Sequence, residues 1–261
     1  MKASAGVGFS SVYEEYERLS RENAIDISRR SVIRKHVERY LKPSDKILEL
    51  NAGSGIDALY FANRGHHVLA TDISDGSEIH IRNKIAENPQ LNLQFERCSF
   101  ENLSAIDGEF DCIFSNFGGL NCTNNLATVF GWFPKLVKTG GFVSLVIMPK
   151  CYPWEMATVL KGNKNAMRRW QKHNNAQVGQ DQIRTFYHSP ADVKAAFPSA
   201  FTHVKTVNIG TFYPSAHFSS FQKFPRILNS LIALDGMVNK LALMPKGIGD
   251  YFIITFKKTR E

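Results

Sequence analysis

The sequence predicts an α/β fold, a seven-stranded, mostly parallel sheet with helices on both faces and a helical lid insertion. Three observations predict it. Short apolar runs typical of buried strands alternate with helical segments from Lys46 to about Met148. Strands that alternate with helices of this size imply a parallel sheet covered on both faces. Two further strand-like runs with a helix between them follow residue 200 and would complete seven strands.

The elements before the insertion follow from periodicity and from turn residues. Two helical stretches, about Val12–Arg21 and Ser28–Leu41, precede the sheet and give an N-terminal helical cap over residues 10–42. Pro89 closes one later helix, and Gly140 with Gly141 ends another. The expected elements of the alternating region are strand Lys46–Leu50, helix Gly55–Asn63, strand Val68–Thr71, helix Ser77–Glu87, strands Leu91–Glu96 and Phe110–Ser115, helix Leu126–Val137 and strand Phe142–Met148.

The pattern changes after residue 150. Residues 151–200 form the expected substrate lid, an insertion above the carboxyl edge of the sheet within a single domain over 1–261. The expected elements of this part are a helix over 152–175, a β-like piece at Thr185–His188, a helix at Ala191–Phe197, strands Phe201–Ile209 and Tyr251–Phe256, and between these strands a helix near Pro225–Leu243.

Composition excludes several classes of protein. The chain has 261 residues, of which 43% are hydrophobic and 21% charged, as in a soluble globular protein. No apolar run approaches the roughly 20 residues that span a bilayer, and the first residues lack the apolar core of a signal peptide. The four cysteines show no CxxC pairing, so we expect reduced thiols, no metal site and a cytoplasmic location.

The net charge of +8 is unevenly placed. Residues 1–40 carry +2, residues 41–150 carry −3 and residues 151–261 carry +9. A basic protein can bind nucleic acid. Here the excess belongs to the C-terminal part, and this placement favours a local preference for an anionic acceptor over nucleic-acid binding.

One turn between a strand and a helix carries the chemistry. In KILELNAGSGIDALYFA, Glu49 lies near the end of a strand, and Asn51, Gly53 and Gly55 follow at alternate positions. Glycine has no Cβ, so backbone N–H groups can approach a ligand closely, and the helix N-terminus adds positive partial charge. In HHVLATDIS, Asp72 ends the next strand, where its carboxylate can accept hydrogen bonds from both ribose hydroxyls of a nucleotide.

Dinucleotides and S-adenosylmethionine both fit this arrangement. The dinucleotide pattern G-x-G-x-x-G would need a glycine at position 51, where this chain has Asn51. The pattern tolerates an alanine such as Ala58 at its last position. The run ELNAGSG instead resembles motif I of the class I S-adenosylmethionine-dependent methyltransferases, E/D-x-G-x-G-x-G. The likeness continues through SFENL, GEFDCIFSNFGGLNC and GGFVSLVIM. This resemblance implies a Rossmann-like fold, S-adenosylmethionine as cofactor and methyl transfer as the reaction.

The resemblance also implies which residues contact the cofactor. They are Glu49, Asn51, Ala52, Gly53 and Gly55 around the amino-acid end, Asp72 at the ribose, Ile73, Ser99 and Phe100 at the adenine, and Asn116 and Phe117 beside the sulfonium. Two positions depart from the family pattern. Asn51 replaces the first glycine, although asparagine tolerates left-handed backbone angles. Ser99 stands where many members have an acid, so the backbone N–H of Phe100 becomes the expected adenine contact.

The N-terminal cap offers further candidates. Tyr13 and Tyr16 share one helical face, and in methyltransferases of this layout a similar helix covers the cofactor. Tyr16 would then reach the methionine carboxylate and Tyr13 the acceptor, whereas ordinary amphipathic packing explains both equally well. Arg29 and Arg30 could pair with that carboxylate, but we expect a solvated helix face for them.

Candidate acceptor residues lie in the lid. Trp154, Arg168, Tyr187 and His188 are expected to line the acceptor pocket, and His188 is the candidate general base for a hydroxyl acceptor. A lone histidine is more often structural. Spacings of three and four residues place four cations on one stripe, which would face solvent or an anionic acceptor: Lys161, Lys164, Arg168 and Lys172. The apolar helix over 227–244 is expected to belong to the core.

The leading hypothesis is a methyltransferase that acts on oxygen of a small-molecule or peptide acceptor, similar to bacterial enzymes of natural-product biosynthesis. A carboxylate acceptor would need no base. Three alternatives stay open. They are a non-enzymatic binding protein on a degenerate methyltransferase fold, a nicotinamide dehydrogenase, and a nucleic-acid methyltransferase, which SNFGG in place of N/D-P-P-Y/F disfavours.

Overall fold

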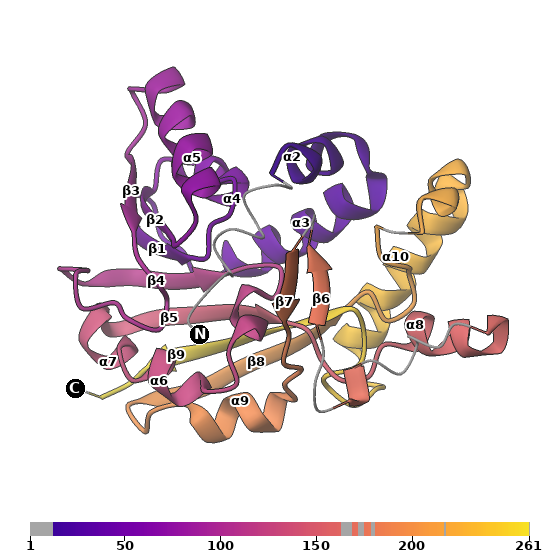
Figure 1. Ribbon diagram of the computed structural model, residues 1–261. Helices are drawn as coiled ribbons and strands as arrows, with labels where there is room; N and C mark the ends of the chain where they lie inside the picture. The colour runs from indigo at the N-terminus through magenta and orange to yellow at the C-terminus, as the bar shows by residue number, and fades with distance from the viewer. Residues whose placement is uncertain (1–12, 163–168, 172–174, 179–180, 217, 261) are drawn as a thin grey trace.

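A seven-stranded sheet forms the centre of the molecule, as the sequence predicts (Figure 1). The computed structural model describes residues 13–162, 169–171, 175–178, 181–216 and 218–260. β9 runs antiparallel to both of its neighbours, and the remaining pairs are parallel. In sheet order the strands are β3 (Leu93–Arg97), β2 (His67–Asp72), β1 (Lys46–Leu50), β4 (Phe110–Ser115), β5 (Val137–Ile147), β9 (Tyr251–Lys258) and β8 (Phe201–Ile209).

Strand register brings the chemically interesting residues to one edge. Glu49 of β1 pairs with Ala70 of β2, and Leu50 pairs with Ser115, the last residue of β4. Since these strands are parallel, their carboxyl ends and the turns that follow them meet at the same edge. Ligands of open α/β sheets bind at this edge, where the strand order reverses.

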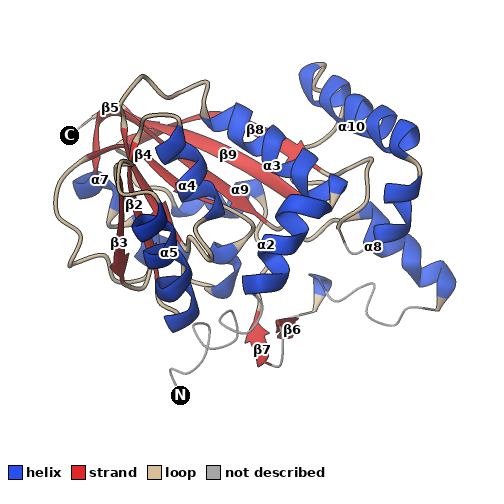
Figure 2. Ribbon diagram, turned by 90° about the horizontal axis from the view of Figure 1, so that it is seen from above, coloured by secondary structure: helices blue, strands red, loops and turns tan. Residues whose placement is uncertain are grey.

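Helices cover both faces of the sheet (Figure 2). One face packs against α3, α4, α5 and α10, and the other against α6, α7 and α9. The helices are α2 (Tyr13–Glu22), α3 (Ala24–Val37), α4 (Ile56–Asn63), α5 (Asp75–Glu87), α6 (Leu126–Phe130), α7 (Phe133–Leu136), α8 (Pro153–Ala157), α9 (Pro190–Ala196) and α10 (Pro225–Lys240), with 3-10 turns η1 (Gly119–Cys122), η2 (Thr158–Lys161) and η4 (Ser219–Lys223).

The prediction for the segment before β5 is wrong in one respect. The helix expected over Leu126–Val137 divides into α6 and α7, and β5 already begins at Val137. Gly140 and Gly141 therefore lie inside a strand and do not end a helix. A Cβ on Gly141 would come within 2.9 Å of the backbone oxygens of Asp111 and Lys138, so this glycine permits close packing between strands.

The insertion differs from the long helix expected over 152–175. Its described part contains α8, η2 and a two-stranded hairpin of β6 (Asn175–Val178) and β7 (Asp181–Arg184). Thr185–His188, expected as β-like, lies in no strand. α9 covers the sheet, since Val193 belongs to the main core, so the last part of 151–200 is not a lid. Lys164, Arg168 and Lys172 lie outside the described residues, and so does the side chain of Lys161.

The helix expected in the core is largely exposed. Along α10 only Leu228 and Asp235 are fully buried. Both ribbon views show this helix at the margin of the molecule, far from β3 (Figures 1 and 2). Within the part of the chain that the structure describes, no helix combines the length and apolar character needed to cross a membrane.

Candidate functional site

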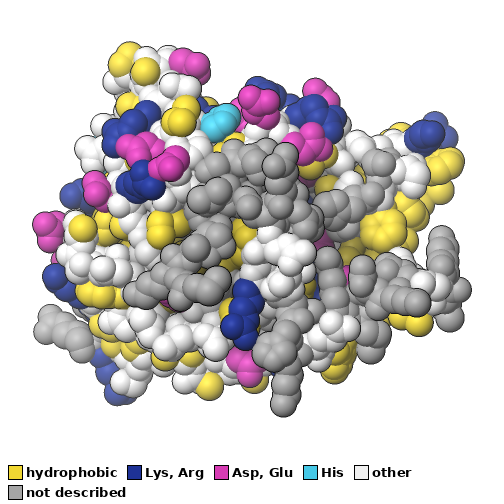
Figure 3. Space-filling model, in the orientation of Figure 1, with side chains coloured by type: hydrophobic (Ala, Val, Ile, Leu, Met, Phe, Trp, Pro, Cys, Tyr) yellow, Lys and Arg dark blue, Asp and Glu magenta, His cyan; other side chains and the backbone are white. Residues whose placement is uncertain are grey.

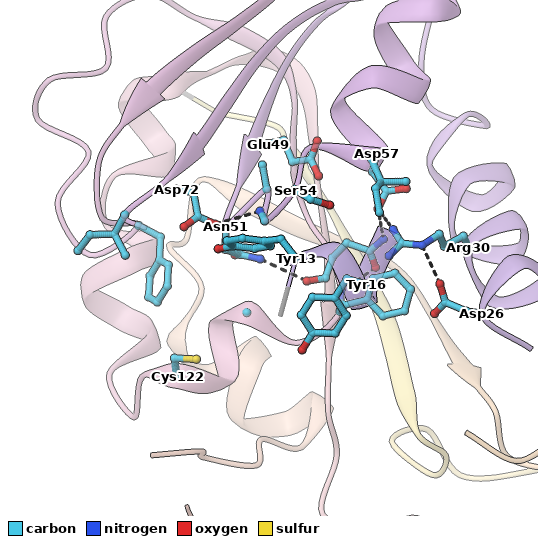
Figure 4. Close-up of a pocket in the computed structure, with 18 of the residues that line it drawn as sticks. Tyr13, Tyr16, Asp26, Arg30, Glu49, Asn51, Ser54, Asp57, Asp72 and Cys122 are labelled. Atoms are coloured by element: carbon cyan, nitrogen blue, oxygen red, sulfur yellow. Dashed lines mark hydrogen bonds and ion pairs between the residues drawn. The ribbon is translucent and has the colours of Figure 1, made fainter. Parts of the chain in front are cut away.

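A cavity of about 300 Å³ lies at the carboxyl edge of the sheet, between the turns after β1, β2 and β4 and helices α2 and α3 (Figure 4). This volume is at the lower end of the range typical of small-molecule pockets. All predicted cofactor residues except Gly55 line it, and so does Tyr13: Tyr13, Tyr16, Glu49, Asn51, Ala52, Gly53, Asp72, Ile73, Ser99, Phe100, Asn116 and Phe117.

The turn after β1 keeps its shape despite the missing glycine. Asn51 adopts φ +47°, the left-handed conformation expected for it. Its side chain accepts a hydrogen bond from Ser115 Oγ at 2.8 Å and donates to the Asn116 carbonyl at 3.2 Å. A Cβ on Gly119 would overlap the Asn51 amide. Gly119 thus provides the space that the asparagine occupies.

Gly53 and Asp72 join the turns after β1 and β2. The Gly53 N–H donates to Asp72 Oδ2 at 3.0 Å, and the Ser74 N–H donates to Oδ1 at 3.0 Å. Burial raises the pKa of the Asp72 carboxyl above its ordinary value. A carboxylate offers about four lone-pair sites, so Asp72 retains acceptor capacity for a ligand. Gly55 faces elsewhere, because a Cβ there would meet Ile81 of α5 at 2.6 Å, so it permits helix packing and contributes no lining surface.

Tyr13 extends from α2 over the same turn. Its hydroxyl and Ser74 Oγ lie 2.5 Å apart, and its side chain is almost fully buried. Burial raises the pKa of the Tyr13 phenol, so this group is neutral. Tyr16 lies one helical turn further along and also borders the cavity, as Figure 4 shows.

A buried carboxylate at the wall of the cavity ties three elements together. Asp57, in the first turn of α4, accepts hydrogen bonds from Arg30 Nη1, Arg34 Nε and Asn116 Nδ2, each at 2.7 Å. The two guanidinium groups and Asn116 hold the pKa of Asp57 below its ordinary value despite its burial. Arg30 also pairs with Asp26 at 3.0 Å. The solvated face expected for Arg29 and Arg30 is therefore wrong, since both side chains are largely buried in ion pairs.

Glu49 provides an unused acceptor. The residue is 2% exposed, and its Oε2 has no hydrogen-bond partner within the described residues. Burial, reinforced by the negative charge of Asp57, raises its pKa well above the ordinary value. A buried polar atom without a partner costs about 1–3 kcal/mol. A ligand that donates a hydrogen bond at this point would remove that cost.

A second ion network closes the opposite side. Asp250 lies just before β9 and pairs with Arg29 at 3.0 Å and with Arg169 at 2.9 Å. Arg169 also pairs with Glu155 of α8 at 2.7 Å and donates to the Pro149 carbonyl at 3.1 Å. Through these bonds the insertion is fastened to α3 and to the end of the sheet.

The acceptor candidates of the insertion that the structure describes, Trp154, Tyr187 and His188, do not line the cavity. His188 is buried, and its Nε2 lies 3.0 Å from the Thr123 carbonyl, to which it donates. Trp154 packs against Phe218 and Phe221, and Tyr187 lies under the Arg169 guanidinium at 5.3 Å. Among the described residues predicted for the acceptor, only Tyr13 borders the cavity. The role of His188 as a base stays a prediction that the geometry does not support.

Several lining residues were not assigned to the site from the sequence, although Arg29 and Arg30 were considered for it. They include Asp26, Arg29, Arg30, Asp57, Cys98, Cys122, Ala216 and Tyr251. Asp26, Arg30 and Arg34 follow one another at intervals of four, and this stripe could have indicated a shared carboxylate on α4. Tyr251 has no local signal, because it reaches the cavity from the far end of the chain. Burial raises the pKa of the Cys122 thiol to about 12, so it is a neutral lining group.

The comparisons with known proteins agree with this geometry. A family profile described as "Methyltransferase domain" matches residues 47–141. No curated protein sequence matches the chain. Structures of similar fold include the Burkholderia thailandensis 1,6-didemethyltoxoflavin-N1-methyltransferase with bound 1,6-didemethyltoxoflavin and S-adenosylhomocysteine. It is 18% identical, with a TM-score of 0.55, over 96% of this chain and 85% of that one.

Two further structures show the same fold. A Mesorhizobium loti S-adenosylmethionine-dependent methyltransferase is 15% identical, with a TM-score of 0.57, over 85% of this chain and 96% of that one. A Haloferax volcanii putative methyltransferase, in complex with the Trm112 methyltransferase activator, is 14% identical, with a TM-score of 0.60, over 99% and 98% of the two chains. Residues 47–141 thus match the profile of a methyltransferase domain, and the chain has the Rossmann-like fold seen in these S-adenosylmethionine-dependent methyltransferase structures.

Proposed function

We propose that the protein transfers a methyl group from S-adenosylmethionine to an oxygen atom of a small-molecule or peptide acceptor, most favourably to a carboxylate. The observation that carries this proposal is the cavity itself. It joins the predicted cofactor residues at the ends of β1, β2 and β4 to a second wall built from α2, α3 and Tyr251. One cavity can therefore hold the methyl donor and leave a side on which an acceptor approaches.

The residues present fit the cofactor. Glu49 has a buried oxygen without a partner, suited to the cofactor's ammonium group, and Asp72 has free acceptor capacity for ribose hydroxyls. Ile73 and Phe100 provide apolar surface for the adenine. When bound, S-adenosylmethionine supplies a methyl group already activated by its sulfonium charge. The chain has then to orient the two reactants and exclude water.

The second wall favours an anionic acceptor. Arg29 lines the cavity with a buried guanidinium whose Nε lacks a hydrogen-bond partner among the described residues. Its N–H can bind a carboxylate, either of the acceptor or of the cofactor's methionine part. No histidine borders the described cavity. A carboxylate acceptor needs no general base, so a wall without histidine is compatible with methyl transfer to a carboxylate.

Asn116 and Phe117 hold the middle of the cavity. Asn116 donates to the buried Asp57, and the Phe117 ring lies 4.3 Å from the Arg30 guanidinium and 5.7 Å from the Tyr251 ring. These contacts fix both side chains. A fixed wall is what alignment of a nucleophile with a methyl group requires.

Incubation with methyl-labelled S-adenosylmethionine tests the proposal. The purified chain is offered carboxylic acids, phenols, amines and short peptides in parallel. A labelled product that releases methanol in mild base is a methyl ester and supports a carboxylate acceptor. Base-stable label on amines would overturn oxygen as the acceptor atom, an outcome that the N1-methyltransferase of similar fold makes worth testing.

An Arg29→Met variant separates the two uses of the guanidinium. If Arg29 binds the acceptor, KM for the acceptor rises at least tenfold while the affinity for S-adenosylhomocysteine is retained. If it holds the methionine part, cofactor affinity falls instead. Lys35→Met is the matched control, because Lys35 lies on the exposed side of the same helix.

A further inference from the structure

An apolar stripe on α10 is left largely exposed by the residues that the structure describes. Ile227, Leu234, Met237 and Leu241 follow one another at intervals of seven, three and four residues, which places them on one side of the helix. Ile227 is 52% exposed, Met237 51% and Leu241 57%. Phe224 and Leu243, beyond the two ends of the helix, are 55% and 66% exposed. We call this set of six side chains the α10 ridge.

Cations flank the α10 ridge, and the sequence around it contains almost no acidic residues. Arg226 and Lys240 neighbour the stripe near its two ends, and Lys223 and Lys246 lie just outside the helix. Between residues 193 and 249 the sequence contains one acidic residue, Asp235. It is buried and accepts backbone N–H groups of residues 210–212, so it does not screen these cations.

The charge pattern argues against a second copy of this chain as the occupant. An antiparallel pair of α10 helices would bring Arg226 of one copy toward Lys240 of the other. A parallel pair would align each cation with itself. Protein interfaces are also depleted in lysine relative to the rest of the surface. The occupant that complements this surface is therefore both apolar and anionic.

Shape favours a membrane over a partner helix. Partner helices dock in grooves, whereas α10 projects at the edge of the molecule (Figures 1 and 2). Hydrophobic side chains gather on the outward side of the molecule at α10, next to a cation (Figure 3). An amphipathic helix with exposed apolar side chains and flanking Lys and Arg is typical of segments that lie in the interface of an anionic bilayer.

We propose that the α10 ridge binds the surface of anionic lipid bilayers, with its apolar side chains in the interface and its cations against the headgroups. This proposal is independent of the acceptor's chemistry, and either proposal can fail alone.

Vesicle flotation with the full chain tests it. We expect binding to phosphatidylcholine vesicles that contain phosphatidylglycerol and little binding to phosphatidylcholine alone. Met237→Asp with Leu241→Asp should lower the partition coefficient at least tenfold, and Arg226→Glu with Lys240→Glu should lower it at least fivefold per cation. Ile79→Asp and Lys135→Glu are the matched controls, at exposed positions on other helices.

Equal melting temperature and equal binding of S-adenosylhomocysteine show that each variant is folded. The proposal is overturned if the wild-type chain ignores anionic vesicles, or if the ridge variants bind them as well as the controls do. It is equally overturned if the chain is a dimer in solution that Met237→Asp dissociates, because the ridge would then be occupied by a second copy.

Discussion

Two regions of the chain contribute to the same cavity in different ways. One is the set of turns at the ends of β1, β2 and β4, and the other is the region after residue 150. The turns supply backbone groups and short polar side chains. Their hydrogen-bond partners lie in the neighbouring turns, as the bond from the Gly53 N–H to the Asp72 carboxylate shows. The later region contributes through long-range ion pairs, chiefly those that Asp250 makes with Arg29 and Arg169. Local chemistry therefore forms the floor of the cavity, and distant contacts fix its wall.

This difference explains what the sequence could predict. Strand ends in a parallel sheet meet at one edge, and the resemblance to the methyltransferase motifs implies which residues there contact the cofactor, so Glu49, Asp72 and Asn116 could be assigned to one site without coordinates. The number of strands and the mostly parallel sheet followed from the alternation of strands and helices. Arg29 and Tyr251 lie more than two hundred residues apart in the sequence. No local spacing could predict that the Arg29 guanidinium lies over the Tyr251 ring, 5.2 Å from its centre.

The surroundings of His188 and of the helix over 227–244 could not be predicted for the same reason. His188 is a candidate base by its residue type, but its position depends on where Thr123 presents a carbonyl, which only the fold determines. The helix over 227–244 was assigned to the core for its apolar content. Its hydrophobic side chains are distributed around the helix, and burial of only one side leaves Met237 and Leu241 exposed.

We expect the largest loss of stability from a substitution at the contact between the N-terminal cap and the floor of the cavity. Asp57→Ala should lower the free energy of unfolding by about 3–5 kcal/mol, because it leaves Arg30 and Arg34 buried without their shared carboxylate. Urea denaturation measures the change. Asp107→Ala, at an exposed position, should change stability by at most about 0.5 kcal/mol. A loss below about 1 kcal/mol for Asp57→Ala would show that this network does not hold the cap.

The next largest effect is a pH-dependent loss of stability at the contact between α3 and β9. His36 Nε2 lies 2.9 Å from Thr255 Oγ1 of β9, and burial, helped by Arg39 and Lys205, lowers the pKa of His36 to about 4. The unfolded chain, with a histidine pKa of about 6.5, therefore binds the proton more readily than the folded chain does. Its contribution to stability is complete above about pH 6.5 and is lost as the pH falls toward 4.

Comparison with His36→Gln isolates this contribution, because glutamine does not titrate. Between pH 6.5 and 4 the wild-type chain should lose about 2–3 kcal/mol more stability than the variant. Parallel pH curves for the two proteins would contradict the burial of a neutral imidazole at this contact.

Asp72→Ala tests whether the floor of the cavity binds the cofactor. Loss of the carboxylate removes the acceptor for ribose and releases the Gly53 and Ser74 N–H groups. We expect the affinity for S-adenosylhomocysteine to fall by about 1–3 kcal/mol in calorimetry. Glu101→Ala, at an exposed position after β3, is the control and should leave the affinity unchanged. Unchanged affinity in Asp72→Ala would mean that the turn after β2 does not bind the ribose.

The smallest effect concerns the replaced glycine of the motif. Gly119→Ala should destabilise the chain by about 1–2 kcal/mol, since its Cβ would displace the end of the Asn51 side chain. Asn51→Gly in the same background removes the obstructing group and should restore most of the loss. Additive effects of the two substitutions in thermal or urea unfolding would show that the residues do not share this space.

Calorimetric titration of the purified chain with S-adenosylmethionine and S-adenosylhomocysteine tests the central claim most directly. The account predicts saturable binding of one cofactor per chain, weakened by Asp72→Ala and unaffected by Glu101→Ala. Absence of both heat and thermal stabilisation at millimolar cofactor, with the protein folded, would contradict it and favour a binding protein on a degenerate methyltransferase fold.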